Sequence, residues 1–286
     1  MFKTVILGCE NSHADTFLDL IAKDPDFSEI QVTGIYSDDA ESTKKLNERF
    51  GVPIMESFDE AVGKVDGVIV TARHGKNHFK YAKPYIAKGV TFFIDKPFTI
   101  DPAEGEELCK LLTENGCGFT GGSSLKHAGF VKELKKAHES SENGSTMGGF
   151  VRTPVDLKSV YGGFYFYAQH LVEIVAEAFG TNPKSVCART SPTGITALFR
   201  YETFDVTGMY AEKNYVYYAE RHSEKGVCGK EFPVDEACFK SEFLEFRDIL
   251  CGKSNGQQPE RMMAPVYIMN ALEKSLNDGG KETLVR

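Results

Sequence analysis

The stretch Val90–Ile100, VTFFIDKPFTI, shows the pattern that decides the fold. Its apolar residues lead directly into an acid, a lysine and a proline, which are Asp95, Lys96 and Pro97. A short apolar run of this kind is typical of a strand that is buried on both faces. The charged residues that follow are either a solvated strand end or part of a site, and the stretch alone allows both.

The first 120 residues alternate between short apolar strands and helices. We expect strands at 3–7, 30–36, 67–71, 90–94 and 117–120, helices at 14–23, 40–50, 76–88 and 102–115, and a short helix opened by a capping box at Ser57 and Glu60. Buried strands separated by helices form βαβ units, and their right-handed crossovers give a doubly wound parallel sheet. The predicted fold class is therefore α/β.

After residue 121 the pattern changes. A helix is expected at 125–138 and another at 167–179, strands follow one another between 185 and 232, and two helices, 235–250 and 259–277, end the sequence. This order indicates an α+β domain with a mostly antiparallel sheet. We therefore expect two domains, a Rossmann domain at 1–121 and an α+β domain at 122–286.

Composition and charge exclude several classes of function. The formal net charge is −8, so no basic surplus is available to replace the counterions of a nucleic acid or an anionic membrane. We find no apolar run of about 18 residues for a membrane span and no signal-peptide pattern. The seven cysteines include no CxxC pair. We expect a cytoplasmic protein with reduced thiols and no nucleic-acid or membrane partner.

The topology of a doubly wound sheet predicts where a ligand binds. Ligands bind outside the carboxyl ends of the strands. Four segments follow such ends, which are the turn at Gly8, Ser37-Asp38, Thr71-Ala72-Arg73 and Asp95-Lys96-Pro97. We expect these four segments to lie along one rim of the sheet.

The first turn, Gly8–His13, reads GCENSH, where a dinucleotide-binding fold usually has G-x-G-x-x-G or A. The first glycine is present, and Glu10 and His13 take the other two positions. Glu10 restricts the approach of a pyrophosphate, whereas Asn11 and Ser12 can hydrogen-bond phosphate at the start of a helix. The turn is compatible with a nucleotide site and equally with an ordinary helix cap.

The second strand ends in Ser37-Asp38-Asp39, the place at which an acid usually binds the ribose hydroxyls. If Ser37 holds the key position, the acid is displaced by one residue. The choice between NAD and NADP therefore stays open. Asp38 and Asp39 could also simply cap the next helix.

Together these residues resemble the Gfo/Idh/MocA family, the glucose–fructose oxidoreductase and inositol dehydrogenase group. The signature of that family is Glu-Lys-Pro after a strand, and Asp95-Lys96-Pro97 is similar to it. Residues 65–78, 160–180 and 243–285 also resemble family patterns. The resemblance implies that 1–121 binds NAD or NADP. It also implies that 122–286 has an open sheet, binds the substrate and forms the interface of a homodimer or homotetramer.

The resemblance implies a dehydrogenase that acts on the CH–OH group of a sugar, a polyol or a related hydroxylated small molecule. Lys96 would lie beside the nicotinamide and the substrate hydroxyl. His170 matches the family histidine that relays the hydroxyl proton, a role that suits the pKa of histidine. The peptide bond between Lys96 and Pro97 is expected to be cis.

The candidate site residues fall into three groups. Lys96 and His170 are the expected catalytic residues. The expected cofactor contacts are Gly8, Cys9, Glu10, Asn11, Ser12, His13, Ser37, Asp38, Thr71, Ala72, Arg73, His78, Asp95, Lys96 and Pro97. The expected substrate contacts are Lys126, His127, Tyr167 and His170. We expect no metal site, because the spacing of His13, His74 and His78 matches no ligand motif.

The chain departs from the family motif at Phe166, where the family has an aspartate four residues before the histidine. A phenylalanine cannot orient the imidazole, and Tyr165 or Tyr167 could take that role. Phe166 also belongs to a run of aromatic residues that could simply be packed. Two further hypotheses are a nucleotide- or sugar-binding relative with a regulatory role, and a metal-dependent lyase or hydrolase.

Overall fold

The computed structural model describes every residue from Met1 to Arg286. The chain forms two compact units, Met1–Gly122 with Phe239–Met262 and Ser123–Cys238 with Met263–Arg286. None of its helices has both the length and the apolar character that crossing a bilayer requires. We describe each unit by itself.

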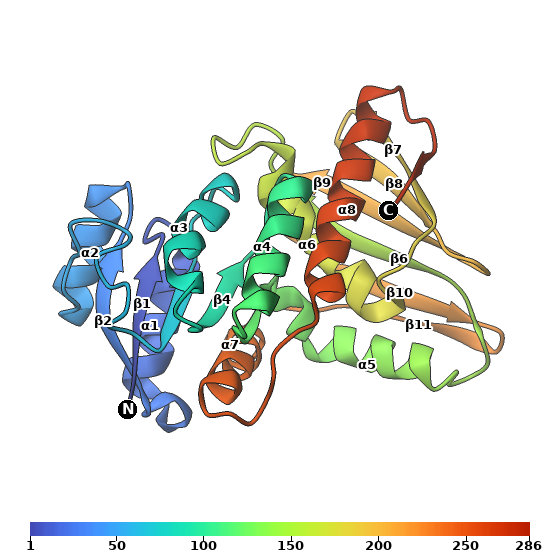
Figure 1. Cartoon of the computed structure of the whole chain (residues 1–286). Helices are drawn as coiled ribbons and strands as arrows, with labels where there is room; N and C mark the ends of the chain where they lie inside the picture. Colours follow the sequence, from blue (N-terminus) through green and yellow to red (C-terminus); the bar gives the residue numbers. More distant parts are fainter. The chain divides into compact units, whose positions relative to one another are not determined.

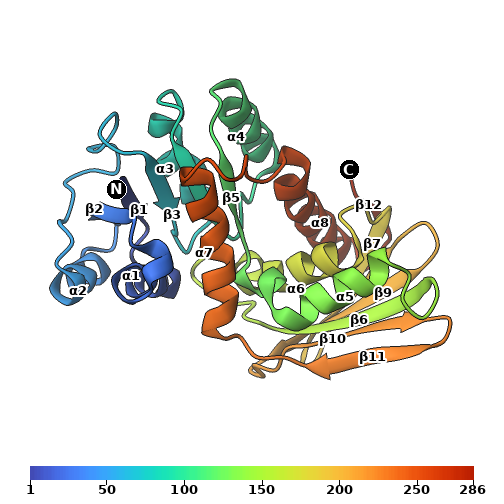
Figure 2. The same cartoon turned by 90° about the horizontal axis from the view of Figure 1, so that it is seen from below.

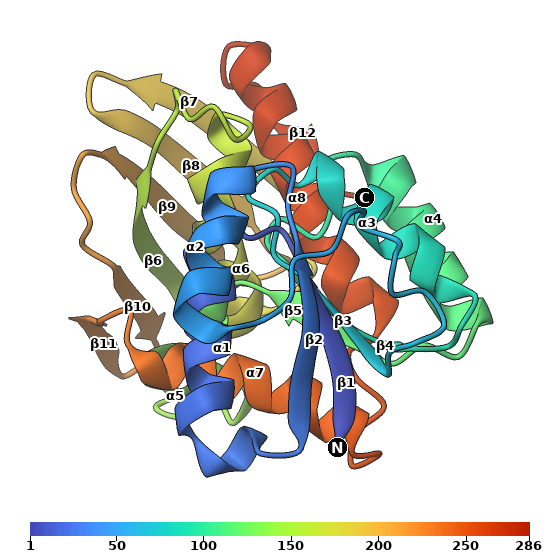
Figure 3. The ribbon, with the colours of Figure 1, turned by 90° about the vertical axis from the view of Figure 1, so that its left-hand side faces the viewer.

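The first unit contains a five-stranded parallel sheet in the order β2-β1-β3-β4-β5. Its strands are β1 (Phe2–Leu7), β2 (Ile30–Tyr36), β3 (Gly67–Val70), β4 (Thr91–Asp95) and β5 (Phe119–Gly122). Its helices are α1 (Ser12–Lys23), η1 (Pro25–Phe27), α2 (Ala40–Phe50), α3 (Lys76–Ile86), α4 (Pro102–Glu114) and most of α7 (Glu236–Leu250). Figure 3 shows α1 and α2 on one side of β1 and β2, with α3 and α4 on the other. This arrangement is the predicted doubly wound α/β fold.

The segment Phe239–Met262 differs from the predicted division, which placed all of 122–286 in the second domain. Phe243 and Phe246 of α7 are fully buried in the core of the first unit. The ring of Phe243 stacks on that of Phe17 of α1, with centroids 4.5 Å apart. Burial of these large aromatic side chains gives α7 its place beside the parallel sheet.

The second unit contains a seven-stranded sheet in the order β11-β10-β6-β9-β8-β7-β12. Its strands are β6 (Thr146–Val155), β7 (Ser185–Ser191), β8 (Gly194–Arg200), β9 (Asp205–Glu212), β10 (Tyr218–Ser223), β11 (Gly226–Glu231) and β12 (Thr283–Leu284). All neighbouring strands are antiparallel except β6 and β9, which are parallel. The predicted α+β unit with a mostly antiparallel sheet is therefore confirmed.

Helices cover one face of this second sheet. They are η2 (Ser124–His127), α5 (Gly129–Glu139), α6 (Phe164–Phe179) and most of α8 (Pro259–Asn277). Figures 1 and 2 show α5 and α6 lying along the sheet. Leu171 of α6 sits so close to Gly208 of β9 that an added Cβ at Gly208 would lie 2.9 Å from its Cδ2.

Two predicted helices differ from the structure. Ser57–Glu60 forms turns, so the predicted short helix is wrong. Its capping side chains bond within the turn, because Ser57 donates to Asp59 and Glu60 accepts from the backbone N–H of Glu56. The predicted helix at 125–138 is two segments, η2 and α5, because the backbone is extended at Ala128.

Candidate active site

The carboxyl ends of β1, β2 and β3 are joined by side-chain hydrogen bonds. Thr71 Oγ1 donates to the carbonyl oxygen of Gly8 at 2.8 Å. The carboxylate of Glu10 accepts the backbone N–H of Arg73 at 2.9 Å and the hydroxyl of Ser37. The structure thus brings these predicted rim segments together, and Glu10 is the residue that connects them.

Gly8 has φ = +107°, and a Cβ added there would lie 2.1 Å from the backbone nitrogen of Ala72. The glycine is therefore required by the close approach of the loop after β3. His78 holds that loop, because its fully buried Nε2 lies 2.7 Å from the carbonyl oxygen of Ala72. Burial lowers the pKa of His78, so the ring stays neutral near pH 7.

Cys9 contributes its side chain to packing. It belongs to the apolar core of the first unit, and burial raises the pKa of its thiol to about 12. Ser12, by contrast, begins α1 and is exposed. Of these two neighbouring predicted cofactor contacts, Ser12 is the one whose side chain is open to solvent.

The two aspartates at the end of β2 have different partners. Asp38 accepts hydrogen bonds from the hydroxyls of Tyr36 at 2.8 Å and Tyr81 at 3.0 Å. The hydrogen bond from Tyr36 is the main cause that lowers the pKa of Asp38. Asp39 accepts two backbone N–H groups at the start of α2. The helix-cap alternative therefore applies to Asp39, and Asp38 remains at the rim as an acceptor.

Asp95 is a fully buried carboxylate at the end of β4. Its Oδ2 accepts from Asn11 Nδ2 at 2.7 Å and lies 2.9 Å from His13 Nδ1. Its Oδ1 accepts the backbone N–H of Lys96 at 2.7 Å. Burial acts to raise the pKa of Asp95, but the charge of His13, its hydrogen bond and the charge of Lys96 outweigh burial and lower that pKa.

Lys96 is only 4% exposed. Burial lowers the pKa of its ammonium group, and the charge of Arg73 acts in the same direction. The carboxylates of Asp95 and Glu242 oppose this effect. The peptide bond between Lys96 and Pro97 is cis, as the resemblance predicted.

Two further residues near this lysine, Glu242 and Gly75, were not predicted from the sequence. Glu242 of α7 is fully buried, and we had assigned its helix to the second domain. Its spacing from Phe239 and Phe246 on the same helical face was the available signal. Gly75 packs against Pro97, since an added Cβ would lie 2.4 Å from Pro97 Cγ. No pattern in the sequence identifies that contact.

In the second unit, His170 lies on α6 and is 7% exposed. Its Nδ1 is 2.7 Å from the hydroxyl of Ser123, which is fully buried. The Ser123 oxygen also accepts the backbone N–H of Leu125 at 3.2 Å. A hydroxyl can both donate and accept, so Ser123 can orient either neutral tautomer of the ring or its protonated form.

Ser123 lies within hydrogen-bond distance of the imidazole of His170, the ring that Tyr165 or Tyr167 could have oriented. Tyr165 donates its hydroxyl to Glu273 of α8 at 3.0 Å. The ring of Tyr167 meets that of His170 edge-on, with centroids 5.7 Å apart. Phe166 packs against Tyr167 at 4.9 Å, which agrees with the alternative of a packed aromatic run. Ser123 was missed because 47 residues separate it from His170.

The predicted substrate contacts Lys126 and His127 are both buried in η2. Lys126 Nζ lies 4.0 Å from Glu173 Oε2. Glu173 follows His170 by three residues on α6, so the two side chains share a helical face. The structure therefore places Lys126 beside the face of α6 that carries His170.

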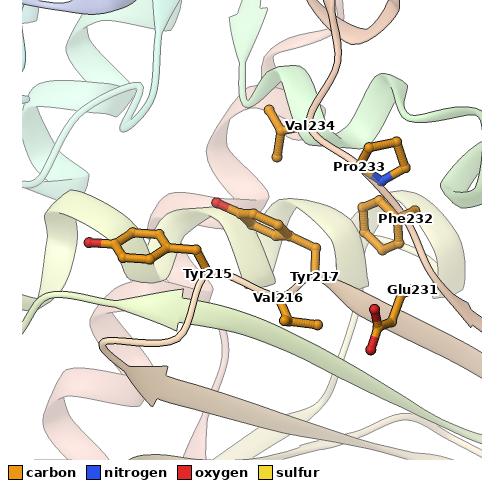
Figure 4. A pocket seen from close by; sticks show the side chains of 7 residues that line it. All are labelled: Tyr215, Val216, Tyr217, Glu231, Phe232, Pro233 and Val234. Carbon is orange, nitrogen blue, oxygen red and sulfur yellow. The ribbon is translucent and has the colours of Figure 1, made fainter.

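A pocket of about 670 Å³ lies in the second unit. Figure 4 shows its lining residues, which are Tyr215, Val216, Tyr217, Glu231, Phe232, Pro233 and Val234. The side chains of Tyr215 and Tyr217 extend to one side of the segment, and that of Val216 extends to the other. The ring of Tyr167 is 6.2 Å from that of Tyr215, so Tyr167 connects the pocket with His170.

No group of three or more His, Cys, Asp or Glu side chains is placed so that it could hold a metal ion. His13 contacts Asp95, and His78 is bonded to the backbone at Ala72. His13 and His78, two of the histidines that prompted the metal hypothesis, therefore serve two separate contacts of the first unit.

A doubly wound parallel sheet of this kind is typical of NAD(P)-binding oxidoreductases. Residues 2–123 match the family model described as "Oxidoreductase family, NAD-binding Rossmann fold", GFO_IDH_MocA. This match confirms the resemblance to the Gfo/Idh/MocA family for residues 2–123. The alternative of a binding protein without redox chemistry receives no support from the match.

Known proteins similar to the chain agree with this class. "Uncharacterized oxidoreductase YhhX" of Escherichia coli is 27% identical over 132 residues, which are 43% of this chain and 38% of that relative. The match thus spans less than half of the relative. The scyllo-inositol dehydrogenase of Lactobacillus casei, solved with NAD(H) and scyllo-inositol, has a TM-score of 0.85 at 15% identity and covers 100% of this chain and 99% of its own. An oxidoreductase of Thermotoga maritima has a TM-score of 0.78 at 16% identity, with 99% and 98% covered. At these identities the two structures show the shared fold.

Proposed function

We propose that this chain is an NAD(P)-dependent dehydrogenase that oxidises a CH–OH group of a polyol, a sugar or a related hydroxylated molecule. The observation that carries the proposal is Lys96, a buried lysine beside the carboxylate of Asp95 at the end of β4. The family match supports the class of cofactor. The polyol bound in the Lactobacillus casei relative supports the class of substrate.

The first unit fits a dinucleotide, and we propose NAD in preference to NADP. Gly8 leaves room for the backbone to turn tightly, and Asn11 and Ser12 stand at the start of α1, where phosphates are favoured. Asp38 supplies a carboxylate at the end of β2, and the carboxylate of Glu10, from the turn after β1, reaches the same place by accepting from Ser37. Carboxylates accept from ribose hydroxyls and repel the additional phosphate of NADP.

When bound, the nicotinamide ring would accept a hydride from the carbinol carbon. We propose that the amine of Lys96 contacts the hydroxyl oxygen of the substrate. Because burial lowers the pKa of Lys96, more of it is a neutral amine near neutral pH than for an exposed lysine. A neutral amine can take the hydroxyl proton, and the resulting ammonium can hold the oxygen of the product.

We assign to His170 the transfer of that proton at Nε2, since Nδ1 is engaged by Ser123. For Nε2 to take a proton, Nδ1 must already carry its hydrogen and donate it to the Ser123 oxygen, and this donation is kept when the ring is protonated. The serine replaces the missing aspartate in orienting the ring. It lacks the negative charge that would stabilise an imidazolium.

We propose that the aromatic residues near His170 pack against the carbon skeleton of the substrate. Tyr167, Tyr215 and Tyr217 offer flat apolar ring surfaces with polar hydroxyls at their tips. Lys126 supplies a donor for hydroxyl groups on the same side of α6. This combination suits a ring that carries hydroxyls on its edge and C–H groups on its faces.

We further propose a cytoplasmic homodimer or homotetramer that pairs the uncovered face of the second sheet. Val206, Gly208 and Tyr210 of β9 are buried on the helix-covered face. Phe150 of β6, Leu198 of β8 and Met209 of β9 alternate to the other face, where each is only partly buried. An apolar sheet face without a covering helix is typical of a subunit interface.

The function is tested first by nucleotide binding. NADH fluorescence is expected to saturate on titration with the protein, with a Kd on the order of tenfold or more below that for NADPH, because Glu10 and Asp38 repel the additional phosphate. Glu10→Gln removes one charge and should narrow this difference. Oxidation of scyllo-inositol and myo-inositol with NAD then tests the substrate class. Failure of both nucleotides to bind at millimolar concentration would contradict the proposal.

Ser123→Ala is expected to lower kcat by up to about tenfold and leave the Kd for NADH unchanged, because one orienting hydrogen bond is worth about 1 kcal/mol. The neighbour Ser124 is also buried and supplies a matched control. Ser124→Ala should retain the wild-type kcat. Equal losses in both variants would show that general damage to η2, and not the orientation of His170, lowers the rate.

A further inference from the structure

Two departures from the usual patterns meet at one point of the first unit. His13 stands where a dinucleotide fingerprint has its third small residue, and Asp95 stands where the family signature has a glutamate. His13 Nδ1 lies 2.9 Å from Asp95 Oδ2. We propose that His13 and Asp95 are a matched pair of positioning residues, in which the imidazole completes the shorter acid and the pair holds Lys96 in place.

The two side chains differ in size from the usual residues in opposite directions. Aspartate is one methylene group shorter than glutamate, so its carboxylate stays closer to β4. Histidine is far larger than glycine or alanine, and it extends from α1 to reach that carboxylate. The space that a longer acid would need is filled by the imidazole of the opposite residue.

Burial and packing fix the contact between His13 and Asp95. His13 is 7% exposed and Asp95 is fully buried, so water does not replace the contact between them. The His13 ring is 5.1 Å from that of Phe239 and 6.1 Å from that of Phe17, edge-on in both cases. These two rings restrict the rotation of the imidazole. Nδ1 of His13 and Oδ2 of Asp95 therefore face each other at the distance of an ion pair.

Asp95 connects this contact to the backbone of Lys96. Oδ1 of Asp95 accepts the backbone N–H of Lys96 at 2.7 Å, while Oδ2 contacts His13 and accepts from Asn11 Nδ2 at 2.7 Å. One carboxylate thus joins the turn after β1 to the backbone at Lys96. A displacement of the carboxylate would therefore also displace the backbone of Lys96, from which its side chain extends.

This inference rests on the proposed function only for the role of Lys96 in the reaction. The arrangement itself is a property of the free protein. We therefore choose a measurement on the protein without nucleotide, so that failure of the proposed function, seen as absent NADH binding, is distinct from failure of this inference.

The test restores the usual residues one at a time and together, as His13→Gly, Asp95→Glu and the double variant. In lysine-labelled protein, NMR reports the ε-CH₂ group of Lys96, whose signal is assigned by its loss in Lys96→Met. Each single variant is expected to shift this signal and to merge its two proton resonances, because the side chain becomes mobile. The double variant is expected to return it toward the wild-type position. The two single effects therefore do not add.

Two further variants make the outcome decisive. Asp101→Glu makes the same change at the N-cap of α4 and should leave the Lys96 signal in place. His13→Asn keeps a donor near the position of Nδ1, and should preserve the signal even if His13→Gly does not fold. Where turnover can be measured, the single variants are expected to lose on the order of 10²-fold in kcat, since misplacement by about 1 Å has that effect.

The proposal is overturned if His13→Gly has a lowered Tm but an unshifted Lys96 signal. That result would mean that His13 stabilises the fold without positioning Lys96. Additive effects in the double variant would overturn the matched pair. A displaced signal in His13→Asn equal to that in His13→Gly would also do so, since the donor at Nδ1 would then be irrelevant.

Discussion

Lys96→Met is expected to lower kcat by on the order of 10²-fold or more while leaving the Kd for NADH within a few-fold of wild type. The variant keeps the length and much of the volume of the side chain and removes only the amine. Cavity formation therefore contributes little to the result. Steady-state kinetics with scyllo-inositol and NAD, together with NADH fluorescence, measure the two quantities. A kcat within a few-fold of wild type would remove Lys96 from the proposed mechanism.

The same variant makes a prediction about stability. Because burial lowers the pKa of Lys96 in the folded chain, the unfolded chain binds its proton more tightly. Below its ordinary pKa of 10.5 the buried ammonium therefore opposes folding, and this opposition disappears only at higher pH. Lys96→Met should then have a Tm at pH 7 that is equal to or above that of wild type. Lys110→Met, at an exposed lysine, is the matched control and should change neither kcat nor Tm.

The pH dependence of the wild-type rate follows from the same group. If neutral Lys96 takes the hydroxyl proton, kcat for oxidation rises with pH and levels off below pH 10.5, since burial lowers the pKa of this lysine. Lys96→Met should lose that rising limb along with most of the rate.

Gly8→Ala is expected to destabilise the first unit by on the order of 4 kcal/mol or more, to the point at which little folded protein is recovered. The added Cβ would lie 2.1 Å from the backbone nitrogen of Ala72 and 2.4 Å from its Cα. Both atoms belong to the backbone of the loop after β3, so no side-chain rotation relieves the overlap. The φ of +107° adds further strain for any residue with a side chain.

Thermal unfolding measures this effect, and a loss of about 4 kcal/mol corresponds to a Tm lower by on the order of 10 °C in a chain of this size. Gly129→Ala is the control, because Gly129 begins α5 and an added Cβ there meets no atom within 4 Å. That variant should change stability by no more than about 1 kcal/mol. A folded Gly8→Ala protein with wild-type Tm would mean that the loop after β3 does not approach the turn this closely.

The five strands of the first unit could be predicted because each is a short apolar run bounded by helix signals. Phe92, Phe93 and Ile94 illustrate this, since all three are fully buried between two layers of helices. Parallel strands must have their carboxyl ends on one edge of the sheet. The order of elements therefore also predicted which residues, from Glu10 to Lys96, would share a rim.

The position of α7 could not be predicted in the same way. Its phenylalanines indicated an amphipathic helix, but an apolar helical face does not specify which core it covers. Phe243 meets Phe17 across more than 200 positions of sequence, and that choice depends on the shapes of both surfaces. The same packing of α7 against the first unit places Glu242 near Lys96.

The sequence by itself determined the fold class and the resemblance to a family, and that resemblance pointed to the two residues proposed for catalysis, Lys96 and His170. These depend on local periodicity and on motifs within a few residues of one another. Only the tertiary structure decided which distant residues surround them, namely Ser123 at His170, and His13 at the Asp95 that precedes Lys96. Hydrogen bonds and burial act over a few ångströms in space, and residues far apart in the chain reach that range only once the chain has folded.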